Sequence, residues 1–266
     1  MPVCPRLLPE LLDQVVDSLC DSRDALKNCC LISKPWIPHA RKHLFAKIQF
    51  RTTKDLELWK ATFPDPSTSP AHYTKVLFIG VVTAAGIGEG CWVLAFSRVV
   101  HLKMDIPAPG FFEQTSIFLV PFHGFSPVLR SLCVESTALI PSQIFDLLRS
   151  FPLLEDISMT VHYRGLIKNS DYSFENQSTA IQSSRSPALD GSLQLFSESG
   201  MDPFVSRLLS LPNGLYSRNV DLVWHHVADV QSSTAELVEG CCSTLESLNI
   251  DGSVICTSVQ HPCQHR

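Results

Sequence analysis

The residues whose types and spacing come closest to a known chemistry are three glycines in an apolar segment. Gly86-x-Gly88-x-Gly90 follows an expected strand and precedes an expected helix. Such a turn can bring backbone N–H groups close to the phosphates of a nucleotide. The third glycine comes one residue earlier than in the dinucleotide-binding pattern, and the chain has no Gly-Lys-Ser/Thr sequence. We favour a flexible strand–helix loop, and a small-molecule or redox enzyme built on this turn is the weaker alternative.

Histidines and cysteines give no second pattern of this kind. His225 and His226 are neighbours on an expected strand and would point to opposite faces of a sheet. The tail sequence His261-x-Cys263-x-His265 has the right residue types for a metal but lacks a fourth ligand. The sequence therefore predicts no catalytic residues, no metal site and no cofactor, and the protein is expected not to be an enzyme.

The composition is that of a folded domain without a basic surface. Of 266 residues, 45% are hydrophobic and 18% are charged, which is enough apolar material for a core and too little charge for a disordered chain. The formal net charge is −5 and the isoelectric point is about 6.0. Nucleic-acid-binding domains carry clustered positive charge, so we expect no nucleic-acid partner.

The sequence also argues against secretion and against a membrane partner. Arg6, Glu10 and Asp13 interrupt any apolar core of a signal peptide, and the most apolar stretch, Val76–Ser97, contains four glycines and Glu89. The ten cysteines include two adjacent pairs and no C-x-x-C spacing, which favours reduced core thiols. We expect a protein of the cytoplasm, the nucleus or both.

The elements that would position any site follow a repeated phrase of apolar, two residues, apolar, one residue, apolar. Its middle residues lie at 48, 76, 102, 132, 157, 193, 220 and 248, in steps of 25 to 36 residues. A period of this size predicts a solenoid, and the phrase matches the strand of a leucine-rich repeat, whose stacks form concave binding surfaces. The clear copies are Phe45-Ile48-Phe50, Tyr73-Val76-Phe78, Val99-Leu102-Met104, Leu129-Leu132-Val134, Leu154-Ile157-Met159 and Leu245-Leu248-Ile250.

Segments with helical spacing follow several of these phrases, namely Thr53–Phe63, Gly90–Phe96, Pro141–Phe151 and Asp202–Leu211. The alternation predicts an α/β solenoid with parallel strands over residues 47–252. A polar stretch at about 163–188 predicts a flexible insertion, and residues 253–266 predict a disordered tail. Because no helical pattern follows Ile250, the last repeat lacks the polar cap that a solenoid needs, which favours a truncated form of a longer protein.

The first forty residues predict a small helical unit. Pro9 suits the first turn of a helix, and either Asp21 or Ser22 could cap a second one. A third helical piece runs over residues 37–45. The first helix carries its apolar residues along one face, at Leu11, Leu12, Val15, Val16 and Leu19.

This helical segment resembles an F-box, a module that opens with L-P-x-E and continues with apolar helix positions that end in leucine. The residues on that register are Leu7, Glu10, Val15 and Leu19, and Leu31-Ile32-Ser33-Lys34 with Trp36 resembles the later V-S-K-x-W stretch. Leu8 stands where the motif has its proline, and Pro9 comes one residue late. With its repeats, the chain is similar to the F-box/leucine-rich-repeat proteins abundant in mushroom-forming (basidiomycete) fungi.

The resemblance implies an adaptor that recognises substrates for an SCF-type E3 ubiquitin ligase. The F-box, residues 5–46, would dock on the linker subunit and through it on the cullin, while the repeats would hold an unknown protein substrate for degradation. Docking would place an apolar helix face in a groove of the linker. We expect that face to comprise Leu7, Leu8, Pro9, Leu12, Val15, Val16 and Leu19, with Trp36 in the core of the module.

The alternative is a repeat-based protein-binding scaffold with a degenerate F-box and no link to a ligase. The displaced proline favours this alternative, because it alters the first turn of the docking helix. A short C-terminal end of the repeats favours it as well.

Overall fold

The computed structural model describes residues 9–32, 34–81, 92–106, 122, 125–136, 145, 147–161, 189–197, 202–211, 215–224 and 230–252. The chain divides into two compact units, Met1–Leu154 and Glu155–Arg266. The predicted boundary between the helical module and the repeats, at residues 46 and 47, lies inside the first unit.

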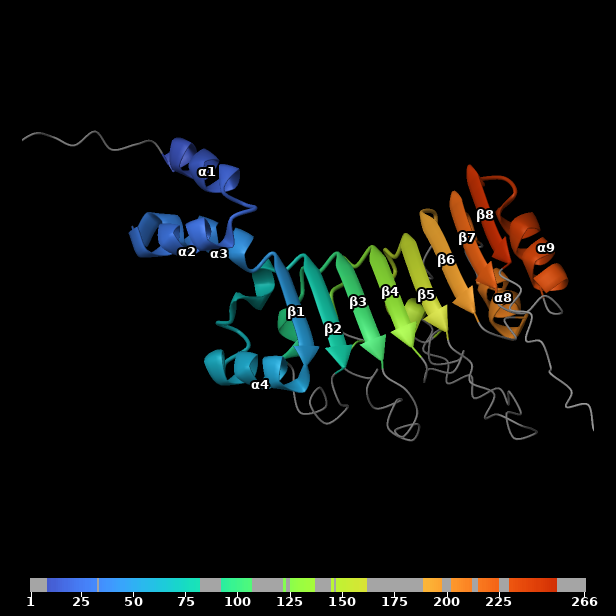
Figure 1. The fold of residues 1–266 in the computed structure, drawn as a ribbon, viewed down its shortest axis with the longest axis horizontal. Coiled ribbons are helices and arrows are strands. Elements are labelled where there is room, and N and C mark those ends of the chain that lie inside the picture. The colour runs from blue at the N-terminus through green and yellow to red at the C-terminus, as the bar shows by residue number, and fades with distance from the viewer. Residues whose placement is uncertain are drawn as a thin grey trace, which may run out of the picture. The chain divides into compact units, whose positions relative to one another are not determined.

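The first unit begins with three α-helices, α1 (Pro9–Ser18), α2 (Arg23–Ile32) and α3 (Ile37–Leu44), and a 3-10 turn, η1 (Lys34–Trp36), joins α2 to α3 (Figure 1). Ser22 is the residue that caps α2, because its hydroxyl oxygen accepts a hydrogen bond from the N–H of Ala25 at 3.4 Å. Pro38 lies in the first turn of α3, where its missing N–H leaves no hydrogen bond unmade. The predicted helical unit is therefore confirmed over the described residues.

Four parallel strands follow in the first unit: β1 (Lys47–Thr52), β2 (Val76–Val81), β3 (His101–Ile106) and β4 (Ser131–Ser136) (Figure 1). Each strand pairs with the next one along the chain. The register aligns Ile48, Leu77, Leu102 and Leu132 in one row, and all four side chains are buried. Successive repeats thus share one apolar core, as expected for stacked strand units.

The second copy of the repeat phrase lies one residue later than predicted. The buried residues are Thr74, Leu77 and Ile79, whereas Val76 and Phe78 are only half-buried. Thr74 occupies the first position of the phrase, and its polarity hid the true register from an apolar pattern. Because side chains alternate along a strand, a shift of one residue exchanges its two faces. The prediction that Val76 is the middle residue of this copy is therefore wrong.

The connection from β1 to β2 contains the predicted helix, α4 (Thr53–Thr62), and a 3-10 turn, η2 (Pro70–Tyr73). Thr52 and Asp55 form a capping box at the start of α4. The Thr52 hydroxyl accepts from the N–H of Asp55 at 3.3 Å, and the Asp55 carboxylate accepts from the N–H of Thr52 at 2.9 Å. This reciprocal pair satisfies two N–H groups that have no partner within the helix.

The prediction of a helix at Gly90–Phe96 is wrong for the described residues 92–96, where the backbone forms a single 3-10 turn, η3 (Val93–Ala95). Trp92 and Phe96 flank this turn and are buried, with their rings 5.8 Å and 6.0 Å from that of Phe50. Trp59 of α4 joins the same group, 5.8 Å from Phe96. The two large rings that flank this short turn pack against Phe50 and Trp59, so they fill the core here without a full helix.

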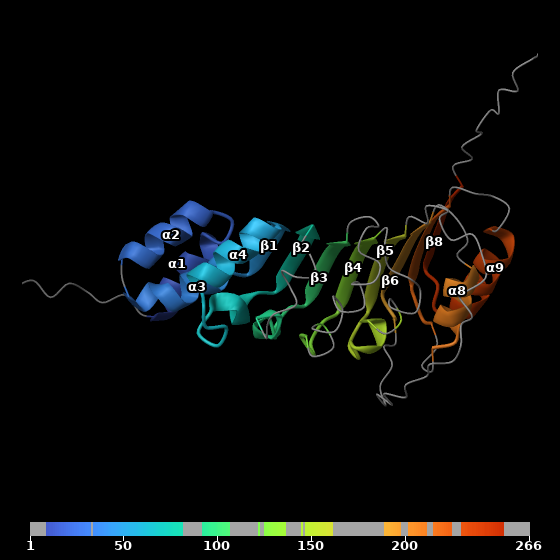
Figure 2. The same cartoon turned by 90° about the horizontal axis from the view of Figure 1, so that it is seen from below.

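The second unit has four parallel strands, β5 (Asp156–Val161), β6 (Ser192–Ser197), β7 (Asn219–Trp224) and β8 (Ser247–Gly252). Helix α8 (Asp202–Leu209) connects β6 to β7, and α9 (Val230–Cys241) connects β7 to β8. The two helices pack against each other (Figure 2). Within this unit the middle residues Ile157, Leu193, Val220 and Leu248 align in one row, as the repeat phrase predicted.

The last described strand differs from the others in burial. Leu248 and Ile250 of β8 are exposed, although their partners in β7, Val220 and Leu222, are buried. The row of buried apolar side chains in the second unit therefore ends at β7 among the residues that the structure describes.

An α/β architecture with an N-terminal helical segment and parallel strands is thus confirmed. The insertion at 163–188, the tail at 253–266 and most of the helix expected at 141–151 lie outside the described residues. Within the described part, no helix combines the length and the apolar character required to cross a bilayer. The cysteines of that part are free thiols, and Cys29 and Cys241 are buried as expected, whereas Cys20 and Cys242 are exposed.

Candidate functional site

The helical unit formed by α1, α2 and α3 has its own small core. Val16 of α1, Leu26 and Cys29 of α2 and Ala40 of α3 are buried together. Leu19, Cys30, Trp36 and Leu44 pack around them and are partly buried. Trp36 therefore belongs to the core of this unit, as predicted.

The predicted docking residues do not share one environment. Leu7 and Leu8 lie outside the described residues, and Pro9 begins α1 without a described side chain. Leu12 and Leu19 are half-buried. The side chain of Val15 is 44% exposed, whereas that of its neighbour Val16 is 1% exposed. Val16 thus holds α1 to the core and is not part of the accessible surface.

The accessible apolar surface of the helical unit includes residues outside the predicted docking face. Leu11 lies one turn before Val15 and is equally exposed. At the end of α2, Leu31 is 84% exposed and Ile32 is 68% exposed. The apolar stripe of α1 indicated the helix, but its width did not show which half faces the core, since that depends on where α2 and α3 pack.

In the first unit, the outward face of the strands combines charged, polar and aromatic side chains. The register places Gln49, Phe78, Lys103 and Cys133 in one outward row. The Lys103 ammonium donates to a carboxylate oxygen of Glu135 at 2.6 Å and lies 5.9 Å from the centre of the Phe78 ring. The hydrogen bond to Glu135 raises the pKa of Lys103. This row offers a partner both charge and a ring face.

The outward row of the second unit is polar. It contains Ser158, Gln194, Asp221 and Asn249, and the Asn249 amide donates to the Asp221 carboxylate at 3.0 Å. The hydroxyl, amide and carboxylate groups of these side chains can form hydrogen bonds with a polar protein surface.

In a stack of such repeats the solvated strand positions are where we expect a ligand face, and these include Gln49, Arg130, Ser131, Ser158, His225 and His226. Gln49, Ser131 and Ser158 lie on outward strand positions, and Arg130 directly precedes β4. His225 and His226 lie outside the described residues, as do the Gly86–Gly90 turn and the tail histidines.

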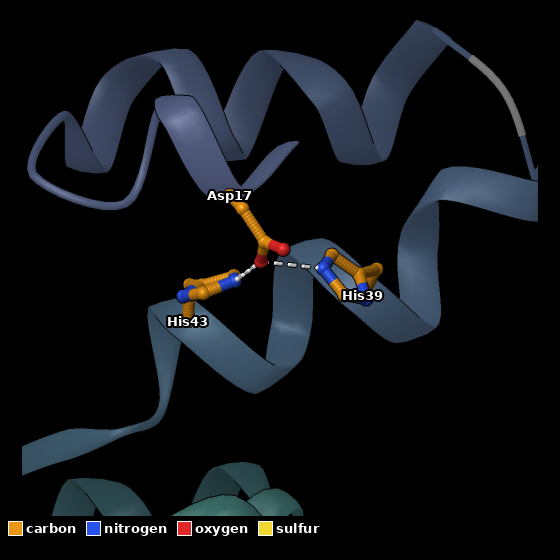
Figure 3. Close-up of side chains that lie close together, drawn as sticks. All are labelled: Asp17, His39 and His43. Atoms are coloured by element: carbon orange, nitrogen blue, oxygen red, sulfur yellow. Dashed lines mark hydrogen bonds and ion pairs between the residues drawn. The ribbon is translucent and has the colours of Figure 1, made fainter. Parts of the chain in front are cut away.

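Three side chains with metal-ligand chemistry converge between α1 and α3 (Figure 3). The Oδ1 atom of Asp17 accepts hydrogen bonds from Nε2 of His39 at 2.7 Å and from Nε2 of His43 at 2.6 Å. Asp13, one turn before Asp17, places its Oδ1 atom 3.4 Å from Nδ1 of His39. We call Asp13, Asp17, His39 and His43 the Asp–His cluster.

The electrostatics of the cluster favour an ionised Asp17. The hydrogen bond from His39, followed by that from His43, lowers the pKa of the Asp17 carboxyl below its ordinary value of 3.8. Since a carboxylate only accepts, each Nε2 that bonds to it carries a proton. Both imidazoles are largely buried, whereas about half of the Asp17 side chain remains accessible to solvent.

The Asp–His cluster was not predicted from the sequence, although the spacing of its residues was visible there. Asp13 and Asp17 are four residues apart, as are His39 and His43, and each pair lies on a predicted helix, where residues four apart share one face. The missing information was that α1 packs on α3, which brings together residues 22 and 26 positions apart in the chain.

Comparison of this chain with models of protein families, with curated proteins and with solved structures found no match.

Proposed function

We propose that this chain is a substrate-recognition adaptor of an SCF-type ubiquitin ligase, in which the helical unit docks on the linker subunit and the strand repeats bind a protein substrate. The observation that carries the proposal is the apolar surface that the helical unit leaves exposed, at Leu11 and Val15 of α1 and at Leu31 and Ile32 of α2. Pairs of apolar side chains that stay exposed on a folded unit, such as these two, are candidates for protein-binding surfaces.

The burial pattern narrows the docking face of α1. Leu11 and Val15 are one turn apart and lie on the same face of the helix, with the half-buried Leu12 beside them. Anchors at this spacing are those of a helix that binds in an apolar groove. Val16 is not part of this docking face, but it fixes the position of α1 because its side chain packs in the core of the helical unit.

The outward strand rows support the substrate half of the proposal. Lys103, Glu135 and Phe78 in the first unit, and Asp221 and Asn249 in the second, offer the mixture of charge, hydrogen bonding and ring surface found in protein interfaces. An adaptor of this class would gain its effect from proximity, because it holds a substrate near the ubiquitin-transfer enzyme and breaks no bond itself. It would work in the cytoplasm or the nucleus.

The test is co-purification of the full chain with the linker subunit of an SCF ligase. Leu11→Asp places a charge in the proposed docking face and is expected to abolish the interaction. Leu58→Asp is a matched control, since Leu58 is an exposed leucine of α4, outside the helical unit. If the wild-type chain is folded and does not bind the linker, the scaffold with a degenerate F-box becomes the better interpretation.

A further inference from the structure

The Asp–His cluster gathers metal-ligand atoms from two helices at one point. His39 and His43 occupy one face of α3, and Asp17 reaches them from α1 (Figure 3). One ligand atom from each of these three side chains lies within 4.8 Å of the other two. Two neutral imidazoles and one carboxylate form a ligand set that proteins use for zinc.

We propose that Asp17, His39 and His43 bind a divalent transition-metal ion, for which zinc is the best match, with water in the fourth position. Two histidines four residues apart on a helix are a known pair of zinc ligands. Solvent reaches the site from the Asp17 side, because that carboxylate is about half exposed, so an ion can enter and keep a bound water. Magnesium and calcium prefer sites built from oxygen alone, and this site has two nitrogen ligands.

The ion requires a small rearrangement of side chains. With zinc–ligand distances of about 2.0–2.2 Å in a tetrahedral site, ligand atoms are about 3.3 Å apart. The two hydrogen-bonded pairs, now at 2.7 Å and 2.6 Å, would open by about 0.6 to 0.7 Å. Rotation of the exposed Asp17 carboxylate and of the two rings can supply these shifts without moving a helix.

Asp13 supplies the outer support that a metal-binding histidine normally has. Metal binding needs the lone pair of each Nε2, so the proton of each ring must reside on Nδ1. In His39 that nitrogen lies 3.4 Å from Oδ1 of Asp13, where the carboxylate can accept its hydrogen bond. Two carboxylates and two neutral imidazoles also balance the charge of a divalent ion.

The bound ion would link α1 to α3 through side chains. Because Val16, on the same helix, contributes to the core of the helical unit, the ion would reinforce the packing that presents Leu11 and Val15. The proposal goes beyond the adaptor function and does not depend on it, since metal binding is measured without a linker subunit.

The experiment uses the full chain, freed of metal with a chelator and titrated with zinc chloride by calorimetry. We expect one tight site, which His39→Gln and His43→Gln remove. Asp13→Asn is expected to lower the affinity about 10- to 100-fold, the usual effect of losing an outer hydrogen bond. His101→Gln, at an exposed position of β3, and His265→Gln, in the tail, are matched controls that should leave binding unchanged.

Two measurements on the unaltered chain keep the test decisive if a variant fails to fold. X-ray absorption at the zinc edge should show a shell of nitrogen and oxygen with imidazole scattering and no sulfur. Amide exchange in α1 and α3 should slow by up to about 100-fold at a free zinc concentration 100 times the dissociation constant. Sulfur in the shell would assign the ion to cysteines and overturn the proposal, as would unchanged exchange or binding that is lost only with His265→Gln.

Discussion

Val15 and Val16 are neighbours with the same side chain and opposite environments, so one substitution made at each position tests both the packing of α1 and the proposed docking face. Val15 is 44% exposed, and Val16 is 1% exposed within the core of the helical unit. We expect Val15→Asp to fold and to lose linker binding, and Val16→Asp to unfold α1 to α3.

The cost at Val16 follows from its burial. Removing the valine loses about 1.5–3 kcal/mol of apolar burial. A carboxylate in its place must be dehydrated or protonated, at a further cost of several kcal/mol. The sum reaches the lower part of the range of about 5–15 kcal/mol that holds a whole domain together, and the helical unit is smaller than most domains. Val16→Ala, which adds no charge, should give an intermediate loss of stability.

The cost at Val15 is small. Valine and aspartate have similar helix propensities, so the change of residue has little effect on the backbone. The residues three and four positions away are leucines and a serine, so the new charge meets no acidic neighbour on its face of α1. Surface substitutions of this kind usually change stability by about 0.5 kcal/mol or less, and partial burial adds a little to that.

Amide hydrogen exchange over residues 9–44 measures the stability of the helical unit, and co-purification measures linker binding. Val15→Asp should exchange like the wild-type chain and fail to bind. Val16→Asp should lose protection across all three helices. Wild-type protection in Val16→Asp would refute the placement of this residue in the core. Wild-type binding by Val15→Asp would refute the docking face on α1.

Three further outcomes follow from local contacts. Thr52→Ala removes the capping box of α4 and should destabilise that helix by about 1 kcal/mol, seen as faster amide exchange in α4 and not in α1. The lowered pKa of Asp17 means that its contribution to stability is present above pH 3.8 and is lost as the pH falls through the folded pKa. Acid unfolding of the helical unit, followed by exchange, should therefore be less steep in Asp17→Asn, and identical curves would contradict the hydrogen bonds from the two histidines. Gly191→Ala should destabilise the second unit, because a Cβ there would clash with the Asp156 carboxylate and would lie 3.0 Å from the Glu155 carbonyl oxygen. Thermal unfolding unchanged by this variant would show that the Asp156 carboxylate and the Glu155 carbonyl make room for the methyl group at no cost.

The sequence by itself determined the elements that depend on local interactions. The helical spacing of Thr53–Phe63 predicted α4, and the structure closes the start of that helix with a capping box between Thr52 and Asp55. The repeat phrase predicted the row of buried middle residues in β1, β3 and β4 and in β5, β6 and β7, because a strand that is covered on one face requires apolar residues at alternate positions. Caps and alternation act over a few residues, so a pattern within one segment is sufficient to reveal them.

The tertiary structure decided where several patterns were ambiguous or silent. Thr74 at a buried position concealed the register of β2, which became clear only from its pairing with β1 and β3. The apolar stripe of α1 could face the core through Val15 or Val16, and contact with α2 and α3 selected Val16. The Asp–His cluster exists because α1 packs on α3 and brings Asp17 to two histidines more than twenty residues away. In each case the deciding contact joins segments distant in the chain, and no pattern within one segment carries that information.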